Sequence, residues 1–363
     1  MEAGWSRRAF LGAIPLLTRV AAGSELKRFR DPATEFDLIR LTDPSSASYL
    51  PPVHLRSATR RSNALIFSSE RAGSLQVFRM DLKTGETRQL TEARNLDHRS
   101  VSLTPDERSI CFIDGRTLMR IRAEGGKLKE IYSVPEGWDL AWSFGLAGNG
   151  QHSVLVEKRG DTSRIRLIRN SRGSAGTVVE TNGIVETALP RPRKEDIVYR
   201  KDAGLWLVNY NGRRNHLLKL ASGRIGPFHW SADGKAILYL LYPDDPRKLN
   251  ELREHVPESS EDKLIASTSQ FVNFAPNGDS SVFVGVSRNK ASPYILLLLR
   301  VPGRELTLCE HRAAHPEDVV VLFSPNSQRL YFHTDRANGA MAIYSMEVER
   351  FVEETDTTEP ELR

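Results

Sequence analysis

The feature that most constrains the fold is an internal repeat of about 44 residues that runs along the whole chain. Each copy begins with a turn tetrapeptide followed by an alternating apolar segment, as in Thr104-Pro105-Asp106-Glu107 before Ser109–Phe112. Further copies start at residues 59, 147, 191, 231, 275 and 324. Eight residues after each start stands a large apolar or aromatic residue: Phe67, Phe112, Leu155, Tyr199, Tyr239, Phe283 and Phe332.

This repeat predicts an all-β fold. Turns of the Pro-Asp/Asn-Gly type join antiparallel strands, and each copy has room for four short strands. Four strands in about 44 residues is the size of one propeller blade. Residues 24–351 are therefore predicted to form a seven-bladed β-propeller of four-stranded antiparallel blades.

The two ends of the propeller predict how the ring closes. The last copy has a third strand, Met341–Val348, but its fourth strand is missing and an acidic tail follows. Residues 35–43 repeat the fourth-strand pattern of Arg88–Thr91, so we expect this N-terminal strand to complete the last blade. Residues 352–363 are predicted to be a disordered tail, and the polar insertion 244–263 is expected to form a short helix over the rim.

The first 23 residues have the pattern of an export signal. Ser6–Leu11 is a twin-arginine sequence, the apolar run Leu11–Leu17 follows it, and Ala21-Ala22-Gly23 supplies small residues for cleavage. The apolar run is too short to span a bilayer. The sequence thus predicts export through the twin-arginine route in a bacterium, to the periplasm or the extracellular space, and no transmembrane span.

Charge and composition narrow the function classes. The formal net charge is +5, and it falls to +3 without residues 1–23, which hold three arginines and one glutamate. Because this small excess is spread along the chain, we expect an anionic small substrate and no nucleic acid. No Gly-x-Ser-x-Gly nucleophile elbow is present, which argues against a peptidase. Cys111 and Cys309 lack any CxxC or Cys/His spacing and are expected to be buried thiols.

Several segments resemble two families of propellers. Segments 68–73 and 80–91 are similar to the repeat of TolB-type propellers and to the first blade of oligogalacturonate lyases. The resemblance to the lyases extends to three further places: Gly204–Gly212, His315-Pro316 ahead of Phe323–Asn326, and Thr334-Asp335.

The resemblance to the lyases implies a specific chemistry. Such enzymes cleave short α-1,4-linked galacturonides by β-elimination, with a histidine base and a Mn²⁺-type metal held by histidines and a glutamine. In this sequence Lys201 stands where the family has the catalytic histidine, and Arg312 stands at the metal-binding glutamine. His315 is retained, and Glu317 stands where the family motif has its second histidine and is expected to be an oxygen ligand. His229 is displaced by two positions, which keeps the same strand face.

The propeller topology predicts a second set of candidates, independent of the family. The innermost strand of each blade precedes the turn tetrapeptide, and its start faces one end of the channel. The residues four to nine positions before each repeat start are thus site candidates. This set contains His98 as a catalytic residue, His54, Arg99, Trp142 and Gln270 as substrate-binding residues, and Glu186 and His315–Asp318 at the same opening. Arg312, which stands at the glutamine position of the lyase motif, is a further substrate-binding candidate that the resemblance implies.

Two functions remain at this point. The first is an enzyme, a lyase of uronate oligosaccharides derived from pectin, with Mn²⁺ or another divalent metal at His315, Glu317 and His229 and with Lys201 or His98 as base. The second is a non-catalytic TolB-like propeller that binds a protein, a peptide or a saccharide in its channel. The altered histidine positions favour the second function, whereas the resemblance along the whole chain and the export signal favour the first.

Overall fold

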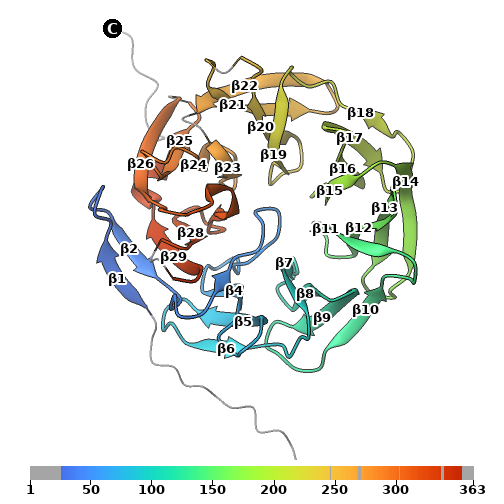
Figure 1. Ribbon diagram of the computed structural model, residues 1–363, viewed down its shortest axis with the longest axis horizontal. Coiled ribbons are helices and arrows are strands. Elements are labelled where there is room, and N and C mark those ends of the chain that lie inside the picture. The colour runs from blue at the N-terminus through green and yellow to red at the C-terminus, as the bar shows by residue number, and fades with distance from the viewer. Residues whose placement is uncertain (1–25, 246, 269–270, 302, 337–338, 354–363) are drawn as a thin grey trace, which may run out of the picture.

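The computed structural model describes residues 26–245, 247–268, 271–301, 303–336 and 339–353. Seven antiparallel sheets are arranged in a ring around a channel (Figure 1), which confirms the predicted seven-bladed propeller. No helix in the described residues is long and apolar enough to span a membrane. The proposed signal, residues 1–23, lies outside the described part of the chain.

The first four blades follow one another in chain order, each built from four strands. Blade one contains β3 (Ser48–Tyr49), β4 (Ala64–Ser69), β5 (Gln76–Asp81) and β6 (Thr87–Gln89); blade two contains β7 (Leu96–Leu103), β8 (Ser109–Asp114), β9 (Thr117–Arg122) and β10 (Lys129–Ser133). Blade three contains β11 (Asp139–Leu146), β12 (His152–Arg159), β13 (Thr162–Arg169) and β14 (Ala175–Asn182); blade four contains β15 (Val185–Pro190), β16 (Asp196–Lys201), β17 (Gly204–Asn209) and β18 (His216–Leu217).

The remaining three blades complete the circle. Blade five contains β19 (Arg224–Trp230), β20 (Ile237–Tyr242), β21 (Asn250–Val256) and β22 (Glu261–Thr268); blade six contains β23 (Phe271–Pro276), β24 (Val282–Ser287), β25 (Tyr294–Leu299) and β26 (Arg304–Glu310). Blade seven contains β27 (Val321–Phe323), β28 (Arg329–Thr334) and β29 (Ala342–Glu347), followed by β2 (Asp37–Arg40) and β1 (Lys27–Arg30). The short helices are η1 (Pro316–Asp318) and α1 (Glu349–Glu353); residues 354–363 of the expected tail lie outside the described residues.

The turn tetrapeptides have one shared hydrogen-bond pattern. In blade two the Thr104 Oγ1 donates to the Asp106 carboxylate at 2.6 Å and accepts from the Ser109 amide at 3.0 Å. Ser231 and Ser324 make the same two bonds in blades five and seven. A hydroxyl or carboxylate side chain that bonds the backbone of its own turn explains why these residues recur at the repeat starts.

Blade six begins two residues later than its sequence pattern predicts. Its turn starts at Asn277, whose amide donates to the Val282 carbonyl at 2.9 Å, as Thr104 does to Ser109 in blade two. Gly285 thus occupies the aromatic position that was assigned to Phe283. A Cβ on Gly285 would lie only 2.2 Å from the Phe271 ring, so an aromatic side chain of the inner strand fills this place instead.

The insertion expected as a helix over the rim is mostly a pair of outer strands. β21 and β22 pair antiparallel, with Leu252 opposite Ala266 on the buried side. The polar residues lie on the other face, where the Arg253 Nε is 2.7 Å from the Asp262 carboxylate. The helix prediction was wrong because an outer strand with one solvated face has as many charged residues as a surface helix.

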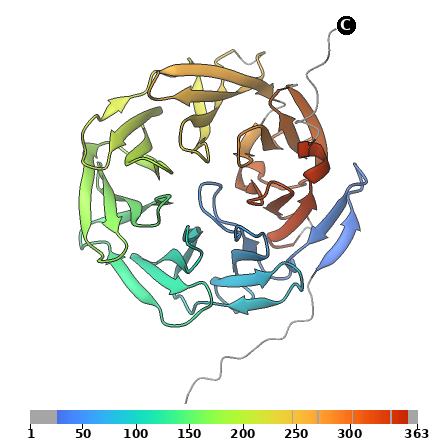
Figure 2. The ribbon, with the colours of Figure 1, turned by 180° about the vertical axis from the view of Figure 1, so that it is seen from behind.

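The N-terminal strand closes the ring as predicted. β2 pairs antiparallel with β29, with Ile39 opposite Ser345 and Arg40 opposite Tyr344. Figures 1 and 2 both place the blue β1–β2 hairpin along the outer side of the red final blade. β1 adds a fifth strand that the sequence pattern did not predict.

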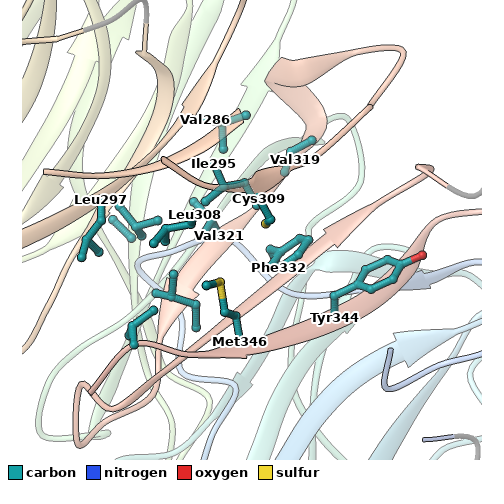
Figure 3. Packing of buried hydrophobic residues seen from close by; sticks show 14 of the residues in the cluster. Val286, Ile295, Leu297, Leu308, Cys309, Val319, Val321, Phe332, Tyr344 and Met346 are labelled. Atoms are coloured by element: carbon teal, nitrogen blue, oxygen red, sulfur yellow. The ribbon is translucent and has the colours of Figure 1, made fainter. Parts of the chain in front are cut away.

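Side chains anchor this closure from both sides. Leu38 belongs to the core cluster between blades six and seven, which also contains Phe332, Tyr344 and the buried thiol of Cys309 (Figure 3).

Burial raises the pKa of both cysteine thiols, for Cys111 to about 12, which fits inert core residues.

A buried ion pair, Asp31–Arg336, holds the loop before β2 against blade seven. Its loss should measure how much ring closure contributes to the free energy of unfolding. The Asp31 carboxylate is fully buried, 2.9 Å from Arg336 Nη2, and accepts from the Ala33 and Thr34 amides. Replacing Asp31 with alanine leaves the Arg336 charge buried and should lower the free energy of unfolding by about 3–5 kcal/mol. Chemical denaturation measures this loss.

The matched control is Asp37→Ala. Its ion pair with Arg30 is exposed on both sides, and exposed pairs contribute at most about 1 kcal/mol. Equal losses for the two variants would contradict the assignment of closure to Asp31.

Candidate functional site

A cavity of about 380 Å³ lies at the end of the channel where the inner strands begin. The loop between β3 and β4 reaches into the centre of the ring (Figure 1) and contributes Pro52 and His54. Inner and second strands of blades two to five supply the rest of the lining: Asp97, Arg99, Ser143, Phe144, Thr187, Leu189, Arg200, Arg224, Ile225, Gly226, Pro227, Phe228, His229 and Tyr242.

His54 is held in a defined tautomer. Its Nε2 lies 2.9 Å from the carbonyl oxygen of Phe144 in β11. Because a carbonyl can only accept, Nε2 carries the hydrogen and Nδ1 keeps its lone pair. Burial lowers the pKa of His54 below its ordinary value, so the ring is uncharged at neutral pH.

His229 is a second uncharged imidazole in the same cavity. It lies in β19, packs edge-on against the Phe274 ring at 5.0 Å and is 8 % exposed. Both ring nitrogens are shielded from solvent and have no hydrogen-bond partner within the described residues. Burial, with nearby His54 as the second cause, lowers the pKa of His229 to about 3.

Three arginines make the cavity electropositive. The guanidinium of Arg224 lies 4.3 Å from the centre of the Tyr242 ring, and that of Arg200 lies 5.2 Å from the centre of the Phe228 ring. Arg200 also donates to the Gly226 carbonyl and forms an ion pair with Glu186 at 3.8 Å. Stacking of this kind holds guanidinium groups in place without neutralising their charge.

Strand alternation separates two predicted catalytic residues from the cavity. Lys201 follows Arg200 in β16 and points to the other face, where its Nζ donates to Thr181 Oγ1 at 2.8 Å. His98 stands between Asp97 and Arg99, which line the cavity, and its own ring stacks on Tyr49 at 4.4 Å. Burial lowers the pKa of His98, and Asp97 opposes this shift. Neither Lys201 nor His98 is a lining residue.

The three predicted metal ligands are not brought together, because His315 Nδ1 and Glu317 Oε1 lie 4.0 Å apart while His229 lies in the cavity. His315 and Glu317 flank Pro316 at η1, their side chains are 72 % and 61 % exposed, and neither lines the cavity that contains His229. Arg312 pairs with Glu310 near the surface. Gln270 lies outside the described residues, and so does the side chain of Trp142 in β11.

The donor atoms of the described residues do not fit a manganese site. No three histidine, cysteine, aspartate or glutamate side chains converge anywhere in the described part of the chain. In the cavity the imidazoles of His54 and His229 are accompanied by a single carboxylate, Asp97, which lies 3.6 Å from Arg99. The resemblance to the lyases implies a metal held by several histidines and a glutamine, and two imidazoles with one carboxylate do not supply that set.

The cavity thus gathers three of the predicted residues, His54, Arg99 and His229, and adds two that the sequence analysis missed. Arg224 and Arg200 are the additions. Arg224 stands seven residues before the repeat start at 231, inside the window that yielded the other candidates. Arg200 stands next to Lys201, the residue that the sequence predicted, and lies on the opposite face of β16.

A larger hollow of about 600 Å³ lies over blades three to five, at the end with the turn tetrapeptides. Its lining includes Lys194 and Glu258, which pair at 2.6 Å, and Glu258 also pairs with Arg191 at 2.7 Å. These contacts hold the pKa of Glu258 at about 2. The charges of Lys194, Arg191 and Glu258 thus satisfy one another at this hollow.

Comparisons with known proteins bear on the whole fold. A family model described as oligogalacturonate lyase matches residues 22–158. The predicted resemblance to these lyases is confirmed. The chain is 22 % identical to an oligogalacturonide lyase of Pectobacterium atrosepticum and 21 % identical to an oligogalacturonate lyase of Dickeya dadantii, covering 88 % of this chain and 95 % of each relative.

Solved structures show the same architecture. An oligogalacturonate lyase in complex with manganese superposes with a TM-score of 0.85 at 21 % identity, covering 90 % of this chain and 97 % of that one. An oligogalacturonate lyase from Vibrio parahaemolyticus gives 0.84 at 20 % identity, covering 89 % and 96 %. At this identity the superposition establishes the fold, while the family match ends before Arg200, Arg224 and His229.

The uncharged state of His229 predicts an acid-sensitive fold. Its pKa falls from an ordinary 6.5 in the unfolded chain to about 3 in the folded protein. Between these values the unfolded chain binds a proton that the folded protein does not, so stability falls as pH falls. From about pH 6.5 to about pH 5 this should cost about 2 kcal/mol.

Denaturation of the protein and of His229→Phe at both pH values checks this expectation. Phenylalanine keeps an aromatic ring against Phe274 and cannot bind the proton, so the variant should lose about 2 kcal/mol less on acidification. An identical pH dependence for both proteins would contradict a buried uncharged His229.

Proposed function

We propose that the cavity at the mouth of the channel binds short uronate oligosaccharides derived from pectin and that the protein cleaves them by β-elimination. The observation that carries this proposal is the meeting of Arg99, Arg200 and Arg224 with two uncharged imidazoles in one cavity. The resemblance to oligogalacturonate lyases over nearly the whole chain supports the same substrate class.

The arginines suit the substrate. Each uronate residue carries a carboxylate, and a guanidinium group binds a carboxylate through two parallel hydrogen bonds. The proton on the carbon next to that carboxylate is only weakly acidic, so its removal requires stabilisation of the negative charge that develops. In this proposal Arg200 and Arg224, which lie over aromatic rings in the cavity, provide that stabilisation.

The uncharged imidazoles are the feature that distinguishes a lyase from a protein that only binds the saccharide. A propeller that only binds an acidic saccharide in its channel needs the arginines but no proton acceptor. An uncharged imidazole beside the arginines adds a group that can accept a proton at neutral pH. This juxtaposition favours the lyase over the non-catalytic binding protein.

Two measurements decide between these functions. Oligogalacturonides are mixed with the protein, ultraviolet absorbance reports the unsaturated uronate product, and titration calorimetry reports binding. Product formation supports the lyase, binding without product supports the non-catalytic propeller, and the absence of both rejects the cavity as a uronate site.

Arg224 gives a specific test of recognition. Replacing it with glutamine removes a charge-assisted hydrogen bond worth about 1.5–3 kcal/mol, so the Kd for trigalacturonate should rise roughly 10- to 150-fold. The matched control is Arg304→Gln, an exposed position at the start of the outer strand β26. An unchanged Kd in Arg224→Gln, or an equal rise in both variants, would place the sugar elsewhere.

We also propose that the protein reaches the periplasm or the extracellular space through the twin-arginine route. The support is the Ser6–Leu11 pattern and the short apolar run that follows. Conservative Arg7→Lys and Arg8→Lys replacement keeps the charge of the segment and should leave the full-length protein in the cytoplasmic fraction. Unchanged export of the double variant would refute the twin-arginine route.

A further inference from the structure

We propose that His54 is the general base of the elimination and that the reaction needs no metal ion. This inference rests on the proposed function and assigns its proton-transfer step to a loop residue of blade one. Neither the family resemblance nor the repeat pattern gives His54 that role.

The tautomer of His54 leaves one ring nitrogen able to accept a proton. The Phe144 carbonyl takes the Nε2 hydrogen at 2.9 Å, so Nδ1 is the nitrogen able to accept a proton. Nδ1 makes no hydrogen bond within the described part of the chain, and, unlike the nitrogens of His229, it is not shut off from solvent. His54 is itself half-buried in the wall of the cavity.

The other candidate bases, His229, Lys201 and His98, do not present a basic nitrogen to the cavity. His229 is uncharged, but both of its nitrogens are buried, so a sugar in the cavity meets only its carbon edge. Lys201 lies on the opposite face of β16 and donates to Thr181. The His98 ring stacks on Tyr49 outside the lining. His54 alone among these four has a free nitrogen in the cavity wall.

Burial and the charged groups around His54 both favour its role as a general base. His54 is readily kept uncharged at neutral pH because burial lowers its pKa. The charged and titratable groups that share its cavity come from four strands: Asp97 and Arg99 (β7), Arg200 (β16), Arg224 and His229 (β19), and Tyr242 (β20). The excess of cations holds the uronate carboxylate while leaving the imidazole unprotonated.

The step is a balanced elimination. His54 Nδ1 removes the proton from C5 of the uronate, next to its carboxylate. The electron pair of that C–H bond forms the C4–C5 double bond, the C4–O glycosidic bond breaks, and the departing oxygen takes a proton from water. Arg200 and Arg224 stabilise the charge that develops on the carboxylate, so no oxidant, reductant or metal enters the balance.

The test compares His54→Gln with the protein itself, in buffer with a chelator throughout. Glutamine can still donate to the Phe144 carbonyl but has no basic nitrogen. Turnover of trigalacturonate should fall roughly 10²–10⁴-fold while the Kd changes little, as expected for loss of a general base. The matched control, His216→Gln on the exposed outer strand β18, should keep full turnover.

The outcomes separate the two proposals. Turnover in chelator that His54→Gln abolishes supports the inference, whereas turnover that survives in His54→Gln overturns it and leaves the lyase function standing. Turnover that requires an added divalent metal overturns the metal-free reaction. Binding without turnover in the unmodified protein refutes both the lyase and its base.

A spectroscopic measurement keeps the inference testable even if His54→Gln folds poorly. Nitrogen NMR of histidine-labelled protein should show His54 with a protonated Nε2 and an unprotonated Nδ1 at neutral pH. The kcat/KM of the unmodified protein should be constant at neutral pH and fall in acid, as His54 takes up a proton. The reverse tautomer, or activity that rises in acid, would overturn the assignment.

Discussion

The whole architecture depends on the antiparallel pairing of β2 with the last strand of the chain, β29. A propeller whose last blade lacks its outer strand exposes a row of unpaired backbone groups. The pairing satisfies this edge, and the Asp31–Arg336 ion pair fixes the preceding loop against blade seven. With the ring closed, every inner strand begins at the same end of the channel. That common polarity brings a loop of blade one and strands of blades two to five around one cavity.

Within the cavity, burial acts differently on two kinds of basic side chain. An imidazole loses its charge readily when buried, because its ordinary pKa lies close to neutrality. A guanidinium keeps its charge under the same conditions. Burial therefore produces neutral His54 and His229 beside cationic arginines. A site that must hold an anion and also accept a proton needs this separation of roles.

The described residues contain no set of three metal-binding side chains. In the proposed reaction the arginines would hold the carboxylate in place of a metal ion, and an imidazole would accept the proton. A metal ion and a pair of arginines both neutralise a carboxylate, but they need different neighbours. The retained His315 lies exposed at η1, while Arg200 and Arg224 lie in the cavity itself. The chain thus has the fold of the manganese-bound relative, and in the proposed reaction Arg200 and Arg224 would hold the charge of the carboxylate.

The fold could be predicted from the sequence because its signal is repeated. In all seven turns the amide of the first residue donates to the carbonyl five residues later. These turns, each followed at a fixed sequence spacing by a position in the core, identify the blades even where one copy is displaced. The register of blade six was misassigned because Pro276-Asn277-Gly278 imitates the usual turn two residues early.

The site was predicted less well, because strand parity decides which side chains line a cavity. Strand parity places Arg200 and not the predicted Lys201 in the cavity lining, and Asp97 and Arg99 and not the predicted His98 between them. One-residue uncertainty does not alter a blade, but it moves a side chain to the opposite face of the sheet. His54 lies on a loop, where no strand periodicity indicates the direction of the side chain.

The central claim is that arginines at the mouth of the channel hold the carboxylate of a uronate sugar. The most direct measurement is a crystal structure of the protein with trigalacturonate, grown in the presence of chelator. The account predicts a uronate carboxylate within hydrogen-bond distance of the Arg200 or Arg224 guanidinium and its C5 carbon facing His54. A sugar bound on another face of the propeller, or a carboxylate in the cavity that contacts neither arginine, would contradict it.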